Sequence, residues 1–442
     1  MGKHAPIWDK DAECMPRPQL EKLQLERLKN VVARVTATVP FYRDLYAQAG
    51  VSSDDIQSLD DIAKLPFTYK QDLRNHYPFG MFAVPVNDLK EIHATSGTTG
   101  KMTVTGYTAR DMYIWAETMA RVYTAGGTTV DDMIHNAYGY GLFTGGLGFH
   151  IGAERIGAAV IPVSGGLTRR QVEIMRDFGS TILVCTPSYA LVLAEAAAAM
   201  GIDLRTETKL RAGFFGAEPW TDLMREDIEE RMGLEAFDIY GLAEIIGPGV
   251  SVECPYHNGL HIAEDHFYPE VIDPETGEPL GYGQLGELVF TTLTKEGLPL
   301  VRYRTRDRTT LWPEQCPCGR TMVRMDKVLG RTDDMLIIRG VNVFPSQVEH
   351  VLLEFEELEP QYVIYVDRER DCLDALEVCV EASAEVCACG ESVLNDLAKR
   401  IRNTMQETLY VSTAIRVVEP GSIERSGGKA RRVVDRRMVF QQ

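Results

Sequence analysis

Residues 158–200 read AAVIPVSGGLTRRQVEIMRDFGSTILVCTPSYALVLAEAAAAM, and this stretch alternates short apolar runs with helical patterns. The apolar runs at 158–163 and 181–185 have the length of buried strands. Segment 168–178 has the amphipathic pattern of a helix, with Thr168 as a candidate N-cap, and the Ala-rich segment 187–200 predicts a second helix. This repeated strand–helix order predicts a mostly parallel sheet with helices on both faces, and therefore an α/β fold.

The sequence changes in character on either side of this stretch. Upstream, apolar residues at helical spacing over 19–35 predict a long helix in a charged N-terminal region. Downstream of about residue 259, short strand patterns joined by turn signals such as DPETG at 273–277 predict a β-rich subdomain.

A further change near residue 330 predicts a second domain. Strand patterns at 363–366 and 376–380 and a helical pattern over 390–407 indicate a small α+β module. A chain of 442 residues is too long for one compact core. We therefore expect a large N-terminal α/β region over 1–330, which includes the β-rich subdomain, and a small C-terminal α+β domain over 331–442.

Composition excludes several classes of function. The net charge of −18 would repel nucleic-acid phosphates and anionic membranes. The N-terminal stretch has no apolar core of the kind that a signal peptide needs, and no run of about 18 apolar residues occurs. Nine cysteines without a secretory signal favour reduced thiols or metal ligands over disulfides. We expect a cytoplasmic protein with small-molecule partners and without nucleic-acid or membrane partners.

The segment TSGTTGK at 95–101 predicts a phosphate-binding loop. Glycines let backbone N–H groups turn toward an anion, hydroxyls add donors, and Lys101 adds a mobile cation. The pattern is not a Walker A loop, because Thr95 stands where the leading glycine belongs and Met102 follows the lysine. The alternative is a flexible surface turn.

Four further segments follow this loop in the chain: YGLAE at 240–244, YRTRD at 303–307, GRTDDMLIIRG at 330–340 and SGGK at 426–429. Together and in this order, the five segments resemble the motifs of the acyl-adenylate-forming (AMP-dependent synthetase and ligase) superfamily. AYGYGLFTGG at 137–146 and GAEP at 216–219 are most similar to its phenylacetate–CoA ligase branch. Ala243 and Arg306 depart from the hydroxyl residue and the glycine that many relatives have there.

The resemblance implies an AMP-forming acid–thiol ligase that uses ATP, Mg²⁺ and coenzyme A. An aryl acid would react with ATP to give an acyl-adenylate and pyrophosphate, and CoA would then give the thioester and AMP. For the assembly, the resemblance implies a homodimer. Two alternatives remain open: adenylation of another aryl acid or transfer to an acceptor other than CoA, and a non-catalytic, zinc-stabilised binding protein of the same fold.

The resemblance also assigns roles in adenylation. Lys429 would bridge the acid carboxylate and the α-phosphate, and Glu244 would bind Mg²⁺, which prefers oxygen ligands. Asp307 would accept hydrogen bonds from both ribose hydroxyls, unless it only pairs with its arginine neighbours. The other ATP and AMP contacts would come from Thr95, Ser96, Gly97, Thr98, Thr99, Gly100, Lys101, Gly216, Ala217, Glu218, Tyr240, Gly241 and Arg331.

The acid pocket and the hinge follow from the same resemblance. Glycines between aromatic residues at 138–146 would let a flat ring lie close to the backbone. The predicted lining is Tyr138, Tyr140, Phe143, Phe215 and Ile245, although aromatic runs of this kind also occur as plain core. Asp333 would be the hinge about which the C-terminal domain, which contains Lys429, turns between the two half-reactions.

Three cysteines and one histidine predict a structural zinc site. Cys316 and Cys318 form a tight pair in the β-rich region, and Cys254 and His261 lie upstream of them. Three thiolates and one imidazole are an ordinary tetrahedral ligand set for zinc. The one-residue gap between Cys316 and Cys318 is shorter than usual, and resemblance to zinc-containing members of the branch strengthens the assignment. His257 is the competing nitrogen ligand.

Overall fold

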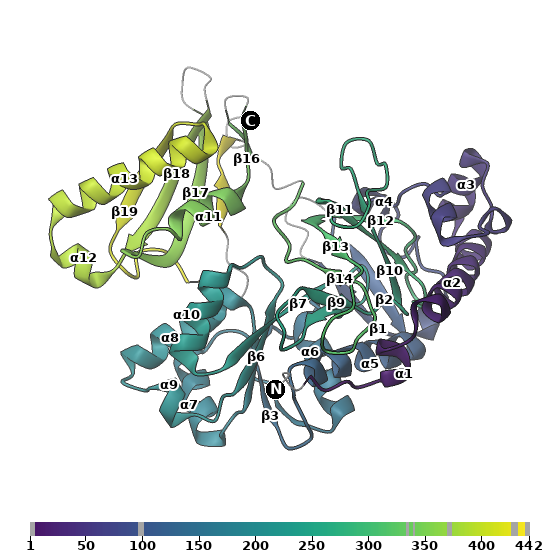
Figure 1. Cartoon of the computed structure of the whole chain (residues 1–442), viewed down its shortest axis with the longest axis horizontal. Coiled ribbons are helices and arrows are strands. Elements are labelled where there is room, and N and C mark those ends of the chain that lie inside the picture. Colours follow the sequence, from purple (N-terminus) through teal and green to yellow (C-terminus); the bar gives the residue numbers. More distant parts are fainter. Residues whose placement is uncertain are drawn as a thin grey trace. The chain divides into compact units, whose positions relative to one another are not determined.

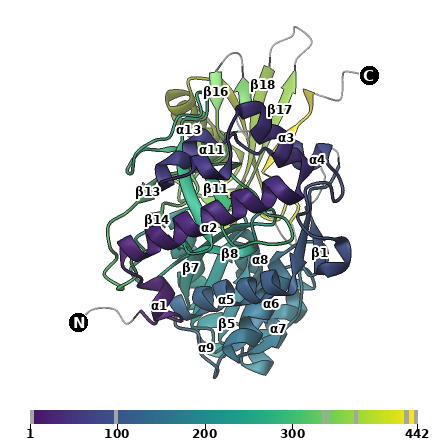
Figure 2. The same cartoon turned by 90° about the vertical axis from the view of Figure 1, so that its right-hand side faces the viewer.

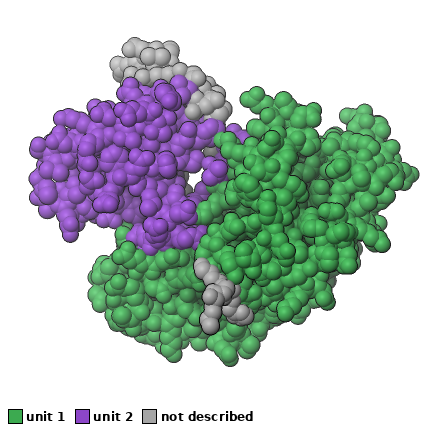
Figure 3. Space-filling model, viewed as in Figure 1, with its two compact units in different colours: residues 1–217, 228–328 green, residues 218–227, 329–442 purple. Residues whose placement is uncertain are grey.

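The chain forms two compact units, shown in Figure 3. In this computed structural model, the described residues are 5–95, 101–332, 336–338, 341–368, 374–425 and 432–437. The first unit comprises Met1–Ala217 and Ile228–Val328, and the second comprises Glu218–Asp227 and Leu329–Gln442. The predicted site residues Ser96, Gly97, Thr98, Thr99, Gly100, Asp333 and Lys429 lie outside the described residues. No helix in the described ranges is long and apolar enough to span a membrane.

A nine-stranded sheet organises the described part of the first unit, in the order β13-β14-β9-β8-β7-β6-β5-β3-β4. Its strands are β3 (Met133–Asn136), β4 (Ala159–Ile161), β5 (Ile182–Cys185), β6 (Ala212–Gly216), β7 (Glu235–Leu242), β8 (Gly247–Glu253), β9 (Leu260–Ile262), β13 (Leu311–Trp312) and β14 (Arg324–Met325). Strands β3 to β7 pair in parallel, whereas β8, β9, β14 and β13 add antiparallel pairs. The expectation of a mostly parallel sheet was therefore wrong for half of the strand pairs, because the chain turns back at 243–246 and returns as β8.

The stretch at 158–200 folds as the predicted strand–helix repeat. It contains β4, α7 (Thr168–Phe178), β5 and α8 (Pro187–Ala199). Thr168 does not cap α7: the N-cap is Leu167, and the Thr168 hydroxyl instead lies 3.3 Å from the hydroxyl of Tyr189 on α8. The α8 N-terminus does have a side-chain cap, because Thr186 accepts a hydrogen bond from the Tyr189 amide.

Helices cover both sides of this sheet, as predicted. Helices α5 (Ala109–Ala125) and α6 (Gly145–Ile156) pack against each other and against β8. Figure 1 shows α7 and α8 on the other side of β6, and Figure 2 shows α5 and α6 facing the viewer. The core between them includes Trp115, Tyr123, Phe149, Phe214 and Phe237, all fully buried.

Smaller elements complete the first unit. Its helices include α1 (Lys10–Glu13), α2 (Arg17–Thr38), α3 (Pro40–Ala49), α4 (Lys70–Asn75) and α9 (Leu204–Glu207), and α10 (Asp222–Met232) runs across the boundary between the units. A hairpin is formed by β1 (Leu89–Ala94) and β2 (Val104–Thr108). The β-rich subdomain contains an antiparallel sheet of β10 (Phe267–Ile272), β11 (Gly286–Thr292) and β12 (Tyr303–Thr309).

The second unit is the small α+β module. Its sheet has the order β19-β18-β17-β20, with β17 (Leu358–Arg368), β18 (Asp374–Ala382), β19 (Thr413–Val418) and β20 (Val433–Asp435). Its helices are α11 (Pro345–Leu352), α12 (Ala384–Ala388) and α13 (Glu391–Leu409), and β15 (Leu336–Ile338) pairs with β16 (Val341–Val343). Helix α13 buries Leu397, Ile401 and Met405 at helical spacing, as its sequence pattern predicts.

Candidate active site

The predicted phosphate loop connects β1 to β2 of the hairpin. Strands β1 and β2 pair in antiparallel register up to Ala94 and Val104. The Thr95 amide then donates to the Thr103 carbonyl at 2.9 Å, so the two ends of the loop are held together at its base. Lys101 is exposed, with its Nζ 5.8 Å from the centre of the Tyr77 ring. The hairpin thus presents the two ends of the hydroxyl-rich segment close to each other.

Glu244 lies in the turn between β7 and β8. The preceding glycine is required, because a Cβ on Gly241 would lie 2.0 Å from the Gly247 carbonyl oxygen. The Glu244 side chain is buried, and its Oε1 lies 3.1 Å from Nζ of Lys70, the first residue of α4. A carboxylate in this position is fixed by the strand turn and faces a cation.

Lys70 and Lys295 are two site residues that the sequence did not identify. Lys70 reaches Glu244 because Thr68 pairs with β12: the Thr68 amide donates to the Arg302 carbonyl, and the Arg304 amide donates to the Thr68 carbonyl. Lys295 is buried, and its Nζ donates to the Thr105 hydroxyl at 2.8 Å and to the Glu244 carbonyl at 3.3 Å. Burial lowers the pKa of the Lys295 ammonium to about 7. No motif spacing relates either lysine to Glu244, because tertiary packing alone brings them together.

Asp307 and Tyr240 meet although they belong to different sheets. The Tyr240 hydroxyl donates to Asp307 Oδ2 at 2.6 Å. Asp307 lies where the pairing of β11 and β12 shifts register, next to Arg306 with φ of 70°. Such a bulge turns a side chain out of the regular strand alternation, which is common beside active sites.

The arginines around Asp307 mostly pair with other carboxylates. Arg302 lies 2.8 Å from Glu270, and Arg304 lies 2.7 Å from Glu287. Arg306 lies 3.4 Å from the same Glu287 carboxylate. Arg302, Arg304 and Arg306 therefore each have a carboxylate partner other than Asp307.

The segment 216–218 ends β6 with a strained backbone. A Cβ on Gly216 would lie 2.4 Å from the Ile239 carbonyl oxygen, so a larger residue would not fit. Ala217 has φ of 70°, a conformation that L side chains rarely adopt and that occurs preferentially at functional sites. The Tyr138 hydroxyl donates to the Gly216 carbonyl at 3.3 Å, which joins the aromatic segment to this strand end.

The predicted pocket residues differ in exposure. The Tyr138 ring stacks on Phe149 with centroids 5.0 Å apart, and Phe215 and Ile245 are fully buried. Phe143 is 54% exposed. The Tyr140 hydroxyl receives a hydrogen bond from Asn136 at 2.8 Å and lies 3.1 Å from His150 Nδ1, and burial raises its pKa to about 12. Tyr140 therefore offers a neutral hydroxyl in this region at physiological pH.

The four predicted metal ligands form one cluster. The ligand atoms of Cys254, His261, Cys316 and Cys318 all lie within 4.8 Å of one another. Cys254 follows β8, His261 is on β9, and the cysteine pair lies in the connection between β13 and β14. His261 Nε2 lies 3.5 Å from Cys318 Sγ, and its Nδ1 is buried without a hydrogen-bond partner among the described atoms. Three sulfurs and one imidazole nitrogen this close together fit the ligand set of a tetrahedral zinc ion.

His257, the competing ligand, faces two carboxylates instead. Its Nε2 lies 3.1 Å from Glu235 and its Nδ1 lies 3.4 Å from Glu253. Within the cluster, Cys254 Sγ lies 3.7 Å from Cys316 Sγ. The geometry of the cluster therefore favours His261.

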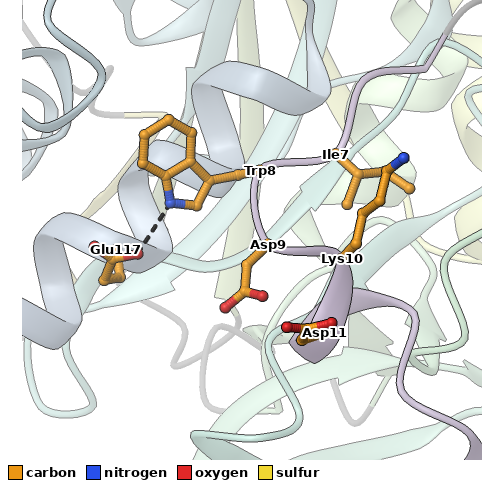
Figure 4. Close-up of a pocket in the computed structure, with 6 residues that line it drawn as sticks. All are labelled: Ile7, Trp8, Asp9, Lys10, Asp11 and Glu117. Atoms are coloured by element: carbon orange, nitrogen blue, oxygen red, sulfur yellow. Dashed lines mark hydrogen bonds between the residues drawn. The ribbon is translucent and has the colours of Figure 1, made fainter.

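A separate pocket of about 540 Å³ lies at the N-terminal segment. Figure 4 shows its lining residues, which are Ile7, Trp8, Asp9, Lys10, Asp11 and Glu117. The Trp8 indole donates to Glu117 at 2.9 Å, and none of the predicted site residues lines this pocket.

Comparison with known proteins gives two family matches. The AMP-binding enzyme model matches residues 18–293, and the AMP-binding enzyme C-terminal domain matches residues 340–437. The chain is 51% identical to a phenylacetate-coenzyme A ligase of Thermus thermophilus, over 98% of this chain and 100% of that protein. It is 50% identical to a protein of the same name from Escherichia coli, over 95% of this chain and 96% of that protein.

Solved structures agree with these matches. A 2-hydroxyisobutyryl-CoA ligase in the postadenylation state, in complex with 2-HIB-AMP, has a TM-score of 0.91 and 31% identity, and the match covers 98% of this chain and 93% of that one. The same enzyme in the thioesterification state, with 2-HIB-AMP and CoA, matches with a TM-score of 0.72 and 32% identity over the same shares of the two chains.

Proposed function

The chain belongs to the AMP-binding enzyme family and is an ATP-dependent aryl-acid–CoA ligase that works through an acyl-adenylate, and on this premise we propose that phenylacetate is its acid substrate. Like other ligases of this kind, it uses ATP, Mg²⁺ and CoA. The observation that supports phenylacetate is identity of 50–52% with four curated phenylacetate-coenzyme A ligases over nearly the full length of both partners.

The reaction would proceed in two displacements. A carboxylate oxygen of the acid attacks the α-phosphorus of ATP, and pyrophosphate leaves. The CoA thiolate then attacks the acyl carbon, and AMP leaves. No protein nucleophile is needed, so positioning and charge neutralisation would do most of the work.

Most of the residues that would hold the nucleotide belong to the first unit, whereas Glu218 and Arg331 belong to the second. The loop from Thr95 to Lys101 would bind the phosphates, and Glu244 would bind their Mg²⁺. Asp307 would accept the ribose hydroxyls, with its carboxylate oriented by the Tyr240 hydroxyl at 2.6 Å. Gly216, Ala217 and Glu218 would lie along the adenine, Gly241 would admit the nucleotide close to the backbone, and Arg331 would contact the ribose or the α-phosphate.

The acid would lie against Tyr138, Tyr140, Phe143, Phe215 and Ile245. The link from the Tyr138 hydroxyl to the Gly216 carbonyl supports this, because it joins the aromatic segment to the strand that we assign to the nucleotide. We further propose that Lys429 acts in adenylation alone, and that a turn about Asp333 removes it before CoA reacts. The related 2-hydroxyisobutyryl-CoA ligase has been captured in both a postadenylation and a thioesterification state, which supports a two-state cycle.

We also propose that Cys254, His261, Cys316 and Cys318 hold a structural Zn²⁺. Four protein ligands would leave no open position, so the ion would stabilise the fold without entering the reaction. The ligands join β8, β9 and the connection before β14, which lie at the antiparallel end of the sheet. A cytoplasmic location and a homodimer stay predictions from the sequence and its resemblance.

The substrate proposal is tested by pyrophosphate release with a panel of acids, with and without CoA. The panel contains phenylacetate, 4-hydroxyphenylacetate, indoleacetate, benzoate and 2-hydroxyisobutyrate. We expect phenylacetate to have the highest kcat/KM and to give phenylacetyl-CoA when CoA is present. If another acid of the panel has a higher kcat/KM, that acid is the preferred substrate and phenylacetate is not. If the enzyme forms the adenylate but makes no thioester with free CoA, the acyl acceptor is a different molecule.

A further inference from the structure

The carbonyls of the Glu244 turn are bound by side chains from outside the turn. Lys295 Nζ donates to the Glu244 carbonyl at 3.3 Å. The Tyr107 hydroxyl donates to the Ile246 carbonyl at 3.0 Å and lies 3.4 Å from the Ala243 carbonyl. Just beyond the turn, the Trp115 indole donates to the Pro248 carbonyl at 2.9 Å. The backbone position of Glu244 therefore depends on side chains from β2, α5 and the connection between β11 and β12.

The connection that contains Lys295 is itself held rigidly. Arg34 on α2 donates to the carbonyls of Lys295 and Glu296, both at 2.7 Å. The Asp111 carboxylate on α5 accepts from the amides of Glu296 at 2.7 Å and of Gly297 at 2.8 Å. Both the carbonyl and amide sides of this connection are thus fixed by charged groups, so the Lys295 side chain starts from a defined backbone position.

The same side chains also contact the hairpin of the predicted phosphate loop. Lys295 Nζ donates to Thr105 on β2 at 2.8 Å and lies 4.5 Å from the centre of the Tyr107 ring on the same strand. Tyr107 stacks on Trp115 with centroids 4.9 Å apart. One buried cluster of Lys295, Tyr107 and Trp115 therefore contacts both β2 of this hairpin and the turn of Glu244.

Stability alone does not account for a lysine in this place. Lys295 is 1% exposed, and its ammonium hydrogen-bonds a hydroxyl and a carbonyl, which are neutral groups. Burial of this ammonium is costly although the nearby carboxylates of Asp111 and Glu244 stabilise its charge, and an apolar side chain of the same volume would fill the space at lower cost. The contacts instead suit a residue that fixes two functional segments relative to each other.

We infer that Lys295 and Tyr107 are positioning residues for adenylation, which hold the Glu244 turn against the phosphate-loop hairpin so that the Glu244 carboxylate meets the Mg²⁺ of ATP. The inference rests on the proposed role of Glu244 as that ligand. Neither residue is assigned a contact with the substrates, so both act through Glu244.

The test compares two matched tyrosine variants. Tyr107→Phe removes the hydroxyl that holds the turn. Tyr123→Phe removes an equally buried hydroxyl, which donates to the Phe149 carbonyl at 3.0 Å and, among the described residues, forms no hydrogen bond with the turn. Lys295→Met is the second test variant, and its ammonium is removed while the length of the side chain is kept. Calorimetric titration with MgATP and, separately, with AMP reports on the metal-dependent part of binding.

We expect the Kd for MgATP to rise about 10-fold in Lys295→Met, as for loss of a hydrogen bond from a charged group, and several-fold in Tyr107→Phe. The Kd for AMP should stay within about twofold in both, because AMP does not need the metal ligand. Pyrophosphate exchange should fall in the same order. Tyr123→Phe should match the wild type in every measurement.

Three outcomes decide the inference. If Tyr107→Phe binds both nucleotides as the wild type does, the positioning role is wrong, whether or not Lys295→Met folds. Equal weakening of MgATP and AMP would also overturn it, because that is the signature of general damage. Glu244→Gln tests the role of Glu244 separately. If this variant binds MgATP with wild-type affinity, the proposed role of Glu244 as the Mg²⁺ ligand is wrong. If Glu244→Gln loses affinity for MgATP but Tyr107→Phe and Lys295→Met do not, Glu244 keeps its role and only the positioning role of the other two residues is wrong.

Discussion

Asp307 is the residue at which one hydrogen bond should matter most for the nucleotide. Asp307→Ala would leave both ribose hydroxyls without a charged acceptor, and such hydrogen bonds contribute roughly 1.5–3 kcal/mol. We expect kcat/KM for ATP to fall on the order of 10- to 100-fold. Tyr240→Phe, which removes the 2.6 Å hydrogen bond to Asp307 but keeps the carboxylate, should have a smaller effect in the same direction. A wild-type constant in a folded Asp307→Ala protein would mean that Asp307 has no ribose contact.

His135 should make the stability of the first unit depend on pH. The Gln171 amide donates to the Ser164 and Gly166 carbonyls, so its oxygen faces His135, and the His135 Nε2–H donates to it at 2.9 Å. A proton on Nδ1 would have no acceptor among the described atoms, and burial lowers the pKa of His135 from 6.5 to about 4. The folded chain therefore holds the His135 imidazole in its neutral form.

The sign of the effect follows from proton uptake. Between the folded pKa of about 4 and the ordinary value of 6.5, the unfolded chain binds more protons at His135 than the folded chain. The contribution to stability is complete above the unfolded value and is lost as pH falls toward the folded one, by about 2 kcal/mol between about pH 7 and about pH 5. His135→Gln should lose correspondingly less unfolding free energy over this range in urea titrations. If the unfolding free energies of the two proteins change with pH in the same way, His135 is not a buried neutral imidazole.

At the scale of elements, the metal cluster joins β8, β9 and the connection between β13 and β14 at the antiparallel end of the large sheet. Cys316→Ser should lower zinc content from about one ion per chain toward zero and lower the Tm, because a structural metal contributes folding free energy directly. Cys379→Ser is the matched control, because Cys379 and Cys316 are each 3% exposed and Cys379 lies in the second unit. Elemental analysis that finds no metal in the wild type, or the same content in both variants, would reject the site.

The elements also show how far the sequence could predict this fold. The strand–helix repeat at 158–200 and the start of α13 near Gly390 depend on local periodicity, and they were predicted within a few residues. The antiparallel half of the large sheet was not predicted, because it follows from the reversal after Leu242, which leaves no periodic signal. The Thr168 cap was wrong because a tertiary contact with Tyr189 uses that hydroxyl.

The candidate site also contains residues that local sequence patterns identify and residues that only tertiary packing brings in. Tyr240, Asp307 and Glu244 belong to segments whose residues recur together in one family, so they could be recognised from local spacing. Lys70 and Lys295 reach Glu244 through the pairing of Thr68 with β12 and through the buried connection after β11. Such contacts depend on the complete fold, and a single sequence has no pattern that reports them.

At the scale of the whole molecule, we propose that one active site performs two successive reactions and uses Lys429 in the first. Lys429 lies in the C-terminal motif SGGK at 426–429, which belongs to the second unit, whereas Glu244 and Asp307 belong to the first. A residue that serves only adenylation must leave when the thioester forms, and a domain rotation about Asp333 would allow this.

The most direct measurement is the rate of each half-reaction in Lys429→Ala. Pyrophosphate exchange reports adenylation, and conversion of supplied phenylacetyl-adenylate with CoA reports thioester formation. We expect adenylation to fall by at least about 10²–10³, as for loss of one preorganised charge-stabilising donor, and thioester formation to stay nearly unchanged. Changes of less than about twofold in both would identify an exposed charge without a catalytic role. Equal loss of both half-reactions in a folded protein would contradict the two-state mechanism.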